Sequence, residues 1–455
     1  MYVLYMDGKT VKKSHEIPVK TTTGKMDMHN KTRSRISDGS YDLLFKKLYC
    51  CNDDGLDYYK NRALNVIDRF NDLFPVMYRD DVCVFSSPGR LELTGNHSDH
   101  QGGAVLTGTV NADILACAAV NDSNMINIIS EGYEDVSVDP GDTEIRTDEK
   151  NTTAALVRGM VRNFADKGFC IRGFDMYAVS DVPGGLGMSS SAAFEMLIGV
   201  VINHLFCGRK VTDEEIAYAG MFAEREYFGK PCGLMDQMAC IKGGINIFDF
   251  RNADKPETKS IDVDLSEKGI DMIVTDTGTD HSDMADDFNA IPGEMYSAAA
   301  VLGGKRLSDI PEDFFYEHIT ELRAKAGDRA VMRAMHWYDE VKRVREQGEN
   351  LLKGDISKFL ENVNSSGYSS FMYLQNIDNY KEPSYQPVAF SLALAHHILG
   401  SGGAVRIQGG GFAGSIIAFV PKEKTERYIS EMDKVLGSGS CRVVNIRTVG
   451  AVKII

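Results

Sequence analysis

Several features are missing from this sequence, and each absence excludes a class of protein. The nine cysteines are odd in number and include no Cys-x-x-Cys pair, so we expect reduced thiols and a cytoplasmic location instead of a disulfide framework. The first residues lack a cationic segment followed by a long apolar run, and the longest apolar stretches, such as 195–206, are too short and too polar for a bilayer. We therefore expect no signal peptide and no membrane partner.

Positive charge is also scarce. Lys and Arg number 50 against 65 Asp and Glu, which gives a formal net charge of −15. Such a surface repels nucleic acid and anionic lipid, so we expect neither as a partner. No internal repeat is present, and no pattern specifies an oligomeric state.

The length and the order of predicted elements indicate two domains of the α+β class. A chain of 455 residues is about three times a typical domain of ~150 residues. Predicted strands and helices are interleaved without a regular βαβ rhythm. Residues 1–40 are mostly polar and almost without apolar periodicity, so we interpret them as an extension that is partly ordered at most. Helical spacing begins in residues 41–74 and returns in 312–366.

A polar cluster lies between glycines in residues 87–103, after a strand predicted at 81–86. It contains Arg90, Asn96, His97, Asp99 and His100. Such a cluster suits a site that hydrogen-bonds a polyhydroxylated ligand, although a solvated loop is an equal alternative. The two histidines resemble half of a metal site, but no second His or Cys pair has matching spacing.

A second segment, VPGGLGMSSSAAFE at 182–195, places glycines before serines at the start of a helix predicted at 189–206. Glycine lets backbone N–H groups approach a phosphate, and the helix N-terminus adds partial positive charge. The segment follows neither the Walker A pattern nor the GxGxxG spacing of dinucleotide sites. Ordinary helix capping is the alternative.

Two shorter segments complete the set. PCGLMDQ at 231–237 is interpreted as an acidic turn, in which apolar neighbours can desolvate Asp236 and make it a useful base, although Asp is common in turns. RIQGGGFAG at 406–414 places three consecutive glycines between predicted strands. Those glycines indicate either close approach of a ligand or a bulge or hairpin.

In this order the four segments resemble the motifs of the GHMP kinases, and of the galactokinases among them. The residues that carry the resemblance are PGRLELTGNHSDHQGG, VPGGLGMSSSAAFE, AEREYFGKPCGLMDQ and IQGGGFAG, with weaker similarity at His281-Ser282 and at 333–336. The resemblance covers about residues 60–455. It implies an N-terminal domain at 41–230, a C-terminal domain at 231–455 and an active site in the cleft between the two domains.

The resemblance further implies an ATP- and Mg²⁺-dependent transfer of the γ-phosphate to the anomeric hydroxyl of a hexose, with galactose as the first candidate. Asp236 would be the base or charge partner of the sugar 1-hydroxyl, and Arg90 would stabilise the phosphoryl group beside it. The sugar would also contact Asn96, His97, Asp99 and Gly233.

The same resemblance assigns the ATP and metal contacts. Ser190 or Ser191, together with Glu224, would hold Mg²⁺. The ATP phosphates would be wrapped by Gly185, Leu186, Gly187, Met188, Ser189, Ser190, Ser191, Ala192, Ala193 and Phe194.

Four positions depart from the family pattern: Asn96 replaces Glu, His100 replaces Tyr, Phe288 replaces a sugar-contacting Tyr, and Ala413 replaces Gly. The phosphate and catalytic positions are kept, so the departures bear on the sugar. Alternatives are a kinase for a uronic acid such as galacturonate or for a pentose, or a non-catalytic sugar sensor, against which the intact Arg90 and Asp236 argue. We expect galactose to lead and Asn96→Glu to improve its turnover.

Overall fold

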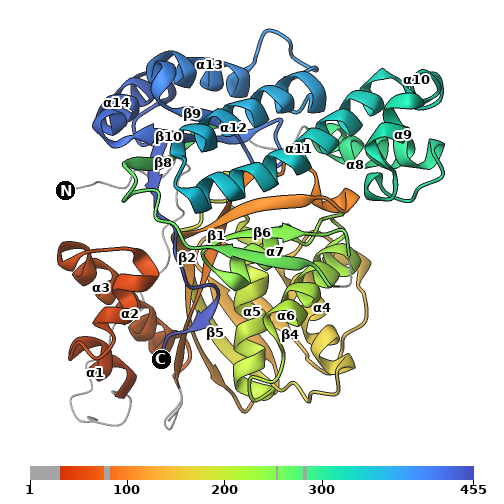
Figure 1. The fold of residues 1–455 in the computed structure, drawn as a ribbon. Coiled ribbons are helices and arrows are strands. Elements are labelled where there is room, and N and C mark those ends of the chain that lie inside the picture. Colours follow the sequence, from red (N-terminus) through yellow and green to blue (C-terminus); the bar gives the residue numbers. More distant parts are fainter. Residues whose placement is uncertain (1–30, 76–81, 253–254, 280–283) are drawn as a thin grey trace.

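The computed structural model describes residues 31–75, 82–252, 255–279 and 284–455, and it contains two sheets, each covered by helices (Figure 1). This mixture of interleaved strands and helices confirms the predicted α+β class. Within the described ranges, no helix combines the length and the apolar character that a bilayer-spanning segment needs.

The first sheet is mostly antiparallel and has the order β12-β1-β2-β5-β3-β4, with β6 paired to β2 and β7 paired to β6. Among the described strands of this sheet, only the β3–β5 pair is parallel. The strands are β1 (Cys83–Thr94), β2 (Ala104–Val120), β3 (Ile126–Ser130), β4 (Val136–Val138), β5 (Phe174–Ser180), β6 (Ile245–Asp249), β7 (Glu257–Ile261) and β12 (Val452–Lys453).

Strand β1 is longer than predicted. The sequence predicted a strand that ends at residue 86, before the polar cluster, yet pairing with β2 continues to Thr94. The register shifts between Pro88 and Arg90, so an irregularity accommodates the proline, which has no N–H to donate. Arg90 is therefore a residue of a buried strand and not of a solvated loop.

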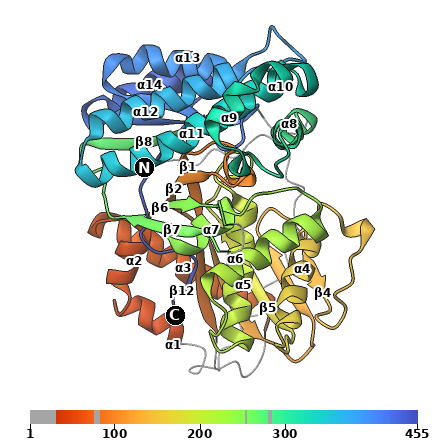
Figure 2. The same cartoon turned by 45° about the vertical axis from the view of Figure 1, so that its right-hand side comes forward.

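Helices cover both faces of the first sheet (Figures 1 and 2). Alternate residues of the strands divide between two cores: Phe85 and Ala116 pack with α5, while Val84 and Leu115 pack with Phe45 of α2. The helices on the first face are α4 (Thr153–Asp166), α5 (Ser190–Phe206), α6 (Asp213–Phe222) and α7 (Met235–Lys242), and those on the second are α1 (Lys31–Ser37), α2 (Asp42–Tyr49) and α3 (Asp53–Leu73).

A helix is present before the predicted boundary at residue 40. Residues 31–37 form α1, whose Ile36 is fully buried in the same core as α2 and α3. A single buried side chain in a polar segment produces no periodicity, so the sequence pattern does not reveal this helix. Residues 1–30 of the predicted extension lie outside the described residues.

The second sheet is antiparallel in the order β11-β8-β10-β9. Its strands are β8 (Ile270–Thr279), β9 (Ala404–Gln408), β10 (Gly414–Pro421) and β11 (Cys441–Val444). Helices α13 (Pro387–Leu399) and α14 (Thr425–Leu436) share one core with this sheet, and α12 (Ile356–Ser369) contacts β9. The remaining helices are α8 (Ala285–Val301), α9 (Glu312–Glu317), α10 (Ile319–Ala326) and α11 (Asp328–Lys353), the last of which also contacts β1 and β2.

The chain passes between the two sheets more than once. Strands β6 and β7 still pair within the first sheet, and β12 returns to it at the end of the chain. We therefore propose that the first domain extends to about residue 261 and is completed by the C-terminal residues, so that the division does not fall at residue 230.

Candidate active site

Two adjoining cavities, of about 500 and 470 Å³, contain most of the residues that the sequence singled out. Both are lined by Arg90, Lys230, Asp236, Phe288 and Gly410, so they meet at these residues. The first cavity also contains the polar cluster of residues 92–100, and the second contains the Gly-Ser segment. The structure thus brings residues of all four sequence segments into one cleft.

Asp236 and Arg90 form an ion pair where the cavities meet. Arg90 Nε and Nη2 lie 2.8 and 2.7 Å from Asp236 Oδ1, and the Ser189 hydroxyl donates a hydrogen bond to Oδ2. Burial alone would raise the pKa of Asp236, but Arg90, the Ser189 hydrogen bond and Lys230 outweigh it and hold that pKa below its usual value. Asp236 is therefore an ionised carboxylate, with its charge already balanced.

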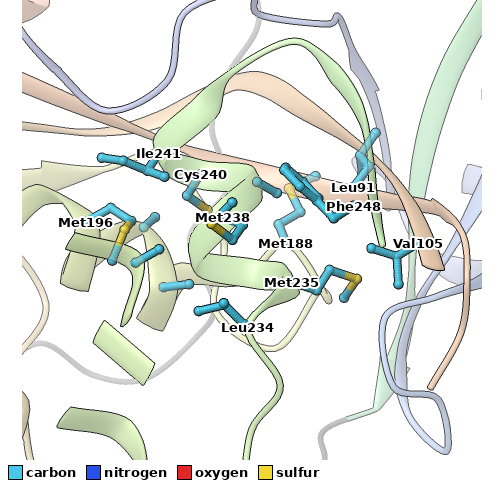
Figure 3. Packing of buried hydrophobic residues seen from close by; sticks show 14 of the residues in the cluster. Leu91, Val105, Met188, Met196, Leu234, Met235, Met238, Cys240, Ile241 and Phe248 are labelled. Atoms are coloured by element: carbon cyan, nitrogen blue, oxygen red, sulfur yellow. The ribbon is translucent and has the colours of Figure 1, made fainter. Parts of the chain in front are cut away.

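Asp236 lies in the first turn of α7 and not in a free turn, as the sequence suggested. The residues of α7 that follow, up to Ile241, are buried: Met238 and Cys240 are fully enclosed, among Leu91 of β1, Met196 of α5 and Phe248 of β6 (Figure 3). Because this packing holds the helix against the sheet, the position of the carboxylate is set by the core.

Asp99 and Gly233 are in contact on the wall of the first cavity. Asp99 opens the short 3₁₀ helix η1 (Asp99–Gln101), and its Oδ1 accepts a bond from the His100 backbone N–H at 2.8 Å. A methyl group at Gly233 would overlap the other oxygen of Asp99, so glycine is required there for steric reasons. Burial, aided by the Asp236 carboxylate, raises the pKa of Asp99 to about 6.

Two histidines complete this wall. Burial lowers the pKa of His97 to about 4, so its ring is neutral at pH 7, and its Nε2 lies 2.9 Å from the carbonyl oxygen of Gly410. A carbonyl only accepts, so the proton resides on Nε2 and Nδ1 remains an acceptor. Both ring nitrogens of His100 are buried without a hydrogen-bond partner among the described residues.

Asn96 also lines the first cavity, but its amide is already engaged by the protein. Nδ2 donates to Glu92 Oε1 at 2.8 Å and to the Gly409 carbonyl at 2.7 Å, and Oδ1 accepts from Asn376 at 2.7 Å. A sugar hydroxyl finds no free N–H here, which gives reason to reverse the expectation that Asn96→Glu improves turnover.

The Gly-Ser segment lines the second cavity and leads into α5. Gly187 and Ser189 both have positive φ, 63° and 57°, which turns the chain sharply before the helix. The lining residues are Gly185, Gly187, Met188, Ser189, Ser190 and Ser191. Leu186, Ala192 and Ala193 line none of the cavities described here, and both alanines are buried in the core.

The second sheet supports this segment. Gln408 Nε2 of β9 donates to the Gly187 carbonyl at 3.0 Å, and the Ser415 hydroxyl of β10 donates to the Leu186 carbonyl at 2.7 Å. The glycine-rich segment at 406–414 thus faces the Gly-Ser segment across the cleft.

A third, mainly apolar cavity of about 280 Å³ adjoins the Gly-Ser segment. It is lined by Tyr133, Leu156, Phe194 and Phe228 together with polar residues that include Asn151, Ser190 and Ser191. Apart from Phe194 and the serines, the sequence gave no sign of this cavity. Its other walls come from separate segments that form no sequence motif.

The residues proposed for Mg²⁺ lie beside the second cavity. Glu224 is almost fully buried on a π-helical turn, η3 (Ala223–Phe228), and its Oε1 accepts from Ser191 Oγ at 3.2 Å and from Lys230 Nζ at 2.8 Å. The described part of the chain contains no group of three or more His, Cys, Asp or Glu residues that could hold a metal ion. One carboxylate and one hydroxyl still suit Mg²⁺, which takes few protein oxygens and completes its shell with phosphates and water.

Sequence reasoning missed some lining residues and misjudged others. Lys230, Arg225 and Tyr296 line the first cavity, and the Tyr296 hydroxyl donates a hydrogen bond to the His100 carbonyl at 2.8 Å. Lys230 and Arg225 lie inside the 223–237 segment, so their positive charge could have indicated from the sequence that they belong to the site. Arg333 and His336 are buried supports, and His336 Nε2 lies 3.0 Å from the Asn96 carbonyl oxygen. His281 and Ser282 lie outside the described residues.

Two known protein families match parts of this chain. Residues 68–120 match the "Galactokinase galactose-binding signature", and residues 155–244 match the "GHMP kinases N terminal domain". The first match contains the polar cluster, and the second contains the Gly-Ser segment, Glu224 and Asp236.

Related sequences cover most of the chain. The galactokinase of Ligilactobacillus salivarius is 28% identical over 376 residues, which span 80% of this chain and 92% of the relative. The galactokinase of Lactobacillus helveticus is 27% identical over 363 residues, spanning 77% and 89% of the two chains.

Solved structures show the same fold. A crystal structure of Lactococcus lactis galactokinase complexed with galactose superposes with a TM-score of 0.72 at 23% identity, covering 85% of this chain and 98% of that one. Methanococcus jannaschii mevalonate kinase gives a TM-score of 0.55 at 14% identity, covering 81% and 99%. The chain is thus a relative of the galactokinases and has the fold of the GHMP kinases.

Proposed function

We propose that this protein is a galactokinase, which transfers the γ-phosphate of ATP to the 1-hydroxyl of galactose. The observation that carries this proposal is the Asp236–Arg90 pair at the meeting point of two cavities, one polar and one bordered by a Gly-Ser turn. A sugar in the first cavity and the phosphates in the second would meet at this pair. The galactose-binding signature and the galactokinase relatives support the choice of sugar.

In the first cavity, Asp236 would face the sugar 1-hydroxyl and take its proton, or hold it in a charged hydrogen bond, as the hydroxyl oxygen attacks the γ-phosphorus. Arg90 would keep Asp236 ionised and stabilise negative charge on the transferring group. Asp99 and the Nδ1 atom of His97 would accept bonds from other hydroxyls and fix the orientation of the ring.

In the second cavity, the backbone N–H groups of the Gly-Ser turn would face the ATP phosphates, and the apolar third cavity would hold the adenine ring of ATP. Ser191 and Glu224 would hold Mg²⁺, with Ser190 as the alternative hydroxyl. The ion, when bound, supplies positive charge to the phosphates. Lys230, which lines both cavities, would add a second cation beside the transferred phosphate.

The cysteines support the proposed cytoplasmic location. All nine lie in the described parts of the chain, and none of them is in a disulfide. Several are enclosed, and burial raises the pKa of Cys207 to about 11, which keeps that thiol protonated and unreactive.

A panel of sugars with Mg·ATP, followed by ADP release, tests the assignment. We expect galactose to give the highest kcat/KM, ahead of galacturonate, N-acetylgalactosamine, glucose and arabinose. A preference for galacturonate or arabinose would keep the chemistry and change the substrate. Galactose binding without any ADP release would favour the sugar sensor.

The metal requirement is tested on the same assay. Turnover should vanish in excess EDTA and return with Mg²⁺, and Glu224→Ala should raise the Mg²⁺ concentration needed for half-maximal rate more than it raises the KM for galactose. Full turnover in excess EDTA would remove Mg²⁺ from the proposal.

A further inference from the structure

The first cavity contains a carboxylate to which the sequence resemblance assigned no role. Glu92 lies on β1, two residues after Arg90, and it lines the first cavity although only 2% of the residue is exposed. Buried carboxylates are rare unless they are paired, so this one requires a reason.

The contacts of Glu92 fix its orientation. Its Oε1 accepts from Arg406 Nη2 at 2.9 Å and from Asn96 Nδ2 at 2.8 Å, and Arg406 Nη1 also holds the Glu92 backbone carbonyl at 2.9 Å. Oε2 accepts no hydrogen bond from any residue in the described ranges, and it is not among the enclosed polar atoms left without a partner. Oε2 is therefore the oxygen that remains open to the cavity.

The neighbouring amide is in the opposite situation. Both hydrogens of Asn96 Nδ2 are used, one by Glu92 and one by Gly409, and Asn376 occupies Oδ1. An amide has two N–H groups, so Asn96 has no donor left for a ligand. Asn96 holds Glu92 in place instead of reading the sugar.

We propose that Glu92 supplies a carboxylate that recognises the sugar, replacing the family's Glu at position 96, where this chain has Asn. We further propose that Glu92 selects neutral sugars over sugar acids. This inference rests on the proposed function. Glu92 Oε2 accepts a hydrogen bond from a sugar hydroxyl, and the charge of the carboxylate strengthens that bond. The same charge repels the carboxylate of a uronic acid, so the loss of Glu at position 96 does not open the site to galacturonate.

The charges around Glu92 support this role. Arg406 is fully buried against it, and Arg90 lies nearby on the same strand. Burial raises the pKa of Glu92 above its usual value, and the Arg406 and Arg90 guanidiniums offset part of that rise by favouring the ionised form. The cavity thus contains a hydrogen-bond acceptor, Glu92, whose position is fixed by Arg406, while Arg406 itself is buried out of reach of a ligand.

The test compares wild type with Glu92→Gln, which keeps the shape and removes the charge. We expect kcat/KM for galactose to fall about 10- to 100-fold, mostly through KM, as for the loss of one charge-assisted hydrogen bond. The ratio of galactose to galacturonate turnover should fall too, because the repulsion is gone. The KM for ATP, which a general loss of structure would also raise, should stay unchanged.

Two further variants guard against a purely structural effect. Asn96→Glu alone places a second carboxylate against the first and should reduce galactose turnover, while the exchange Glu92→Asn with Asn96→Glu restores one carboxylate and one amide and should recover much of it. Such rescue is a non-additive coupling between the two positions. Unchanged galactose selectivity in a folded Glu92→Gln, or improved turnover in Asn96→Glu alone, would overturn the proposal.

Calorimetric binding of galactose separates this proposal from the proposed function. If the wild type binds galactose without phosphorylating it, the kinase assignment fails, and weaker binding to Glu92→Gln still supports Glu92. If binding is equally tight in both proteins, Glu92 does not recognise the sugar, whatever the reaction.

Discussion

Among single residues, the charges at the meeting point of the cavities are already paired with one another in the described structure. Arg90 is held by Asp236 and by the Gly187 carbonyl, and Lys230 is held by Glu224. Burial alone would lower the pKa of Lys230, but the Glu224 and Asp236 carboxylates outweigh it and raise that pKa. A cation held in place in this way costs little reorganisation when a phosphate arrives.

Replacing Lys230 tests this arrangement. We expect Lys230→Met to lower kcat about 10- to 100-fold, somewhat less than the ~10²–10³ that follows loss of a buried oxyanion donor, because the lysine side chain is 46% exposed. The control is Lys242→Met, which removes an equal charge from the far end of α7, where Lys242 pairs with Glu214 at 2.7 Å. Steady-state kinetics on both variants decide the matter; equal effects would contradict a role for Lys230.

Asp99 predicts a pH dependence of sugar binding. With its pKa raised to about 6, Asp99 is charged at pH 7 and becomes protonated as the pH falls through 6. The protonated group is a weaker acceptor, so KM for galactose at saturating ATP should rise between pH 7 and pH 5. Asp236, whose pKa is lowered, stays ionised over this range.

The Asp99→Asn variant is the matched control for that profile. It should bind galactose weakly at every pH and lose the rise in KM. A wild-type profile that persists in Asp99→Asn would place the titrating group elsewhere.

At the scale of elements, α1–α3 cover a sheet face that would otherwise be apolar and open. Phe45 of α2 is fully buried against this face, while Leu43 on the same helix is 84% exposed. Phe45→Ala should lower the free energy of unfolding of the first domain by about 3–5 kcal/mol, and Leu43→Ala by less than about 0.5 kcal/mol. Urea unfolding measures both; equal stabilities would mean that α2 does not pack on the sheet.

The helices and strands also show how much of the secondary structure could be predicted from the sequence. Helices at 42–73 and the helix after the Gly-Ser turn follow from apolar spacing and caps, and both are confirmed. Strand β1 was predicted to end at residue 86 because a polar cluster between glycines follows it, and the π-helical turn η3 has no separate sequence pattern. Glu92 was missed because its partner Arg406 lies more than 300 residues away in the chain. Lys230 is only six residues from its partner Glu224, within a segment that the sequence had already singled out, so it could have been found.

For the whole molecule, the cleft depends on contacts between the first sheet with its helices and the second sheet. Arg406 of β9 binds Glu92 of β1, and Gln408 and Ser415 hold the Gly-Ser turn from the second sheet. The motifs predicted which segments meet, whereas the third cavity and the return of β12 to the first sheet arise from tertiary packing. A change in either sheet therefore affects the binding of both substrates.

The most direct test of the account is phosphoryl transfer by Asp236→Asn, compared with wild type and with product identified by phosphorus NMR. Wild type should convert galactose and ATP to galactose 1-phosphate. The variant keeps the shape and loses the charge, so its kcat should fall about 10²- to 10⁴-fold.

Galactose binding to the same variant should stay close to wild type. The single tryptophan, Trp337, hydrogen-bonds the Ser98 carbonyl at 3.0 Å and can report that binding by fluorescence. Collapse of phosphorylation with retained binding is the result that the account predicts. Near-normal kcat in Asp236→Asn, or phosphate on a hydroxyl other than the anomeric one, would contradict it.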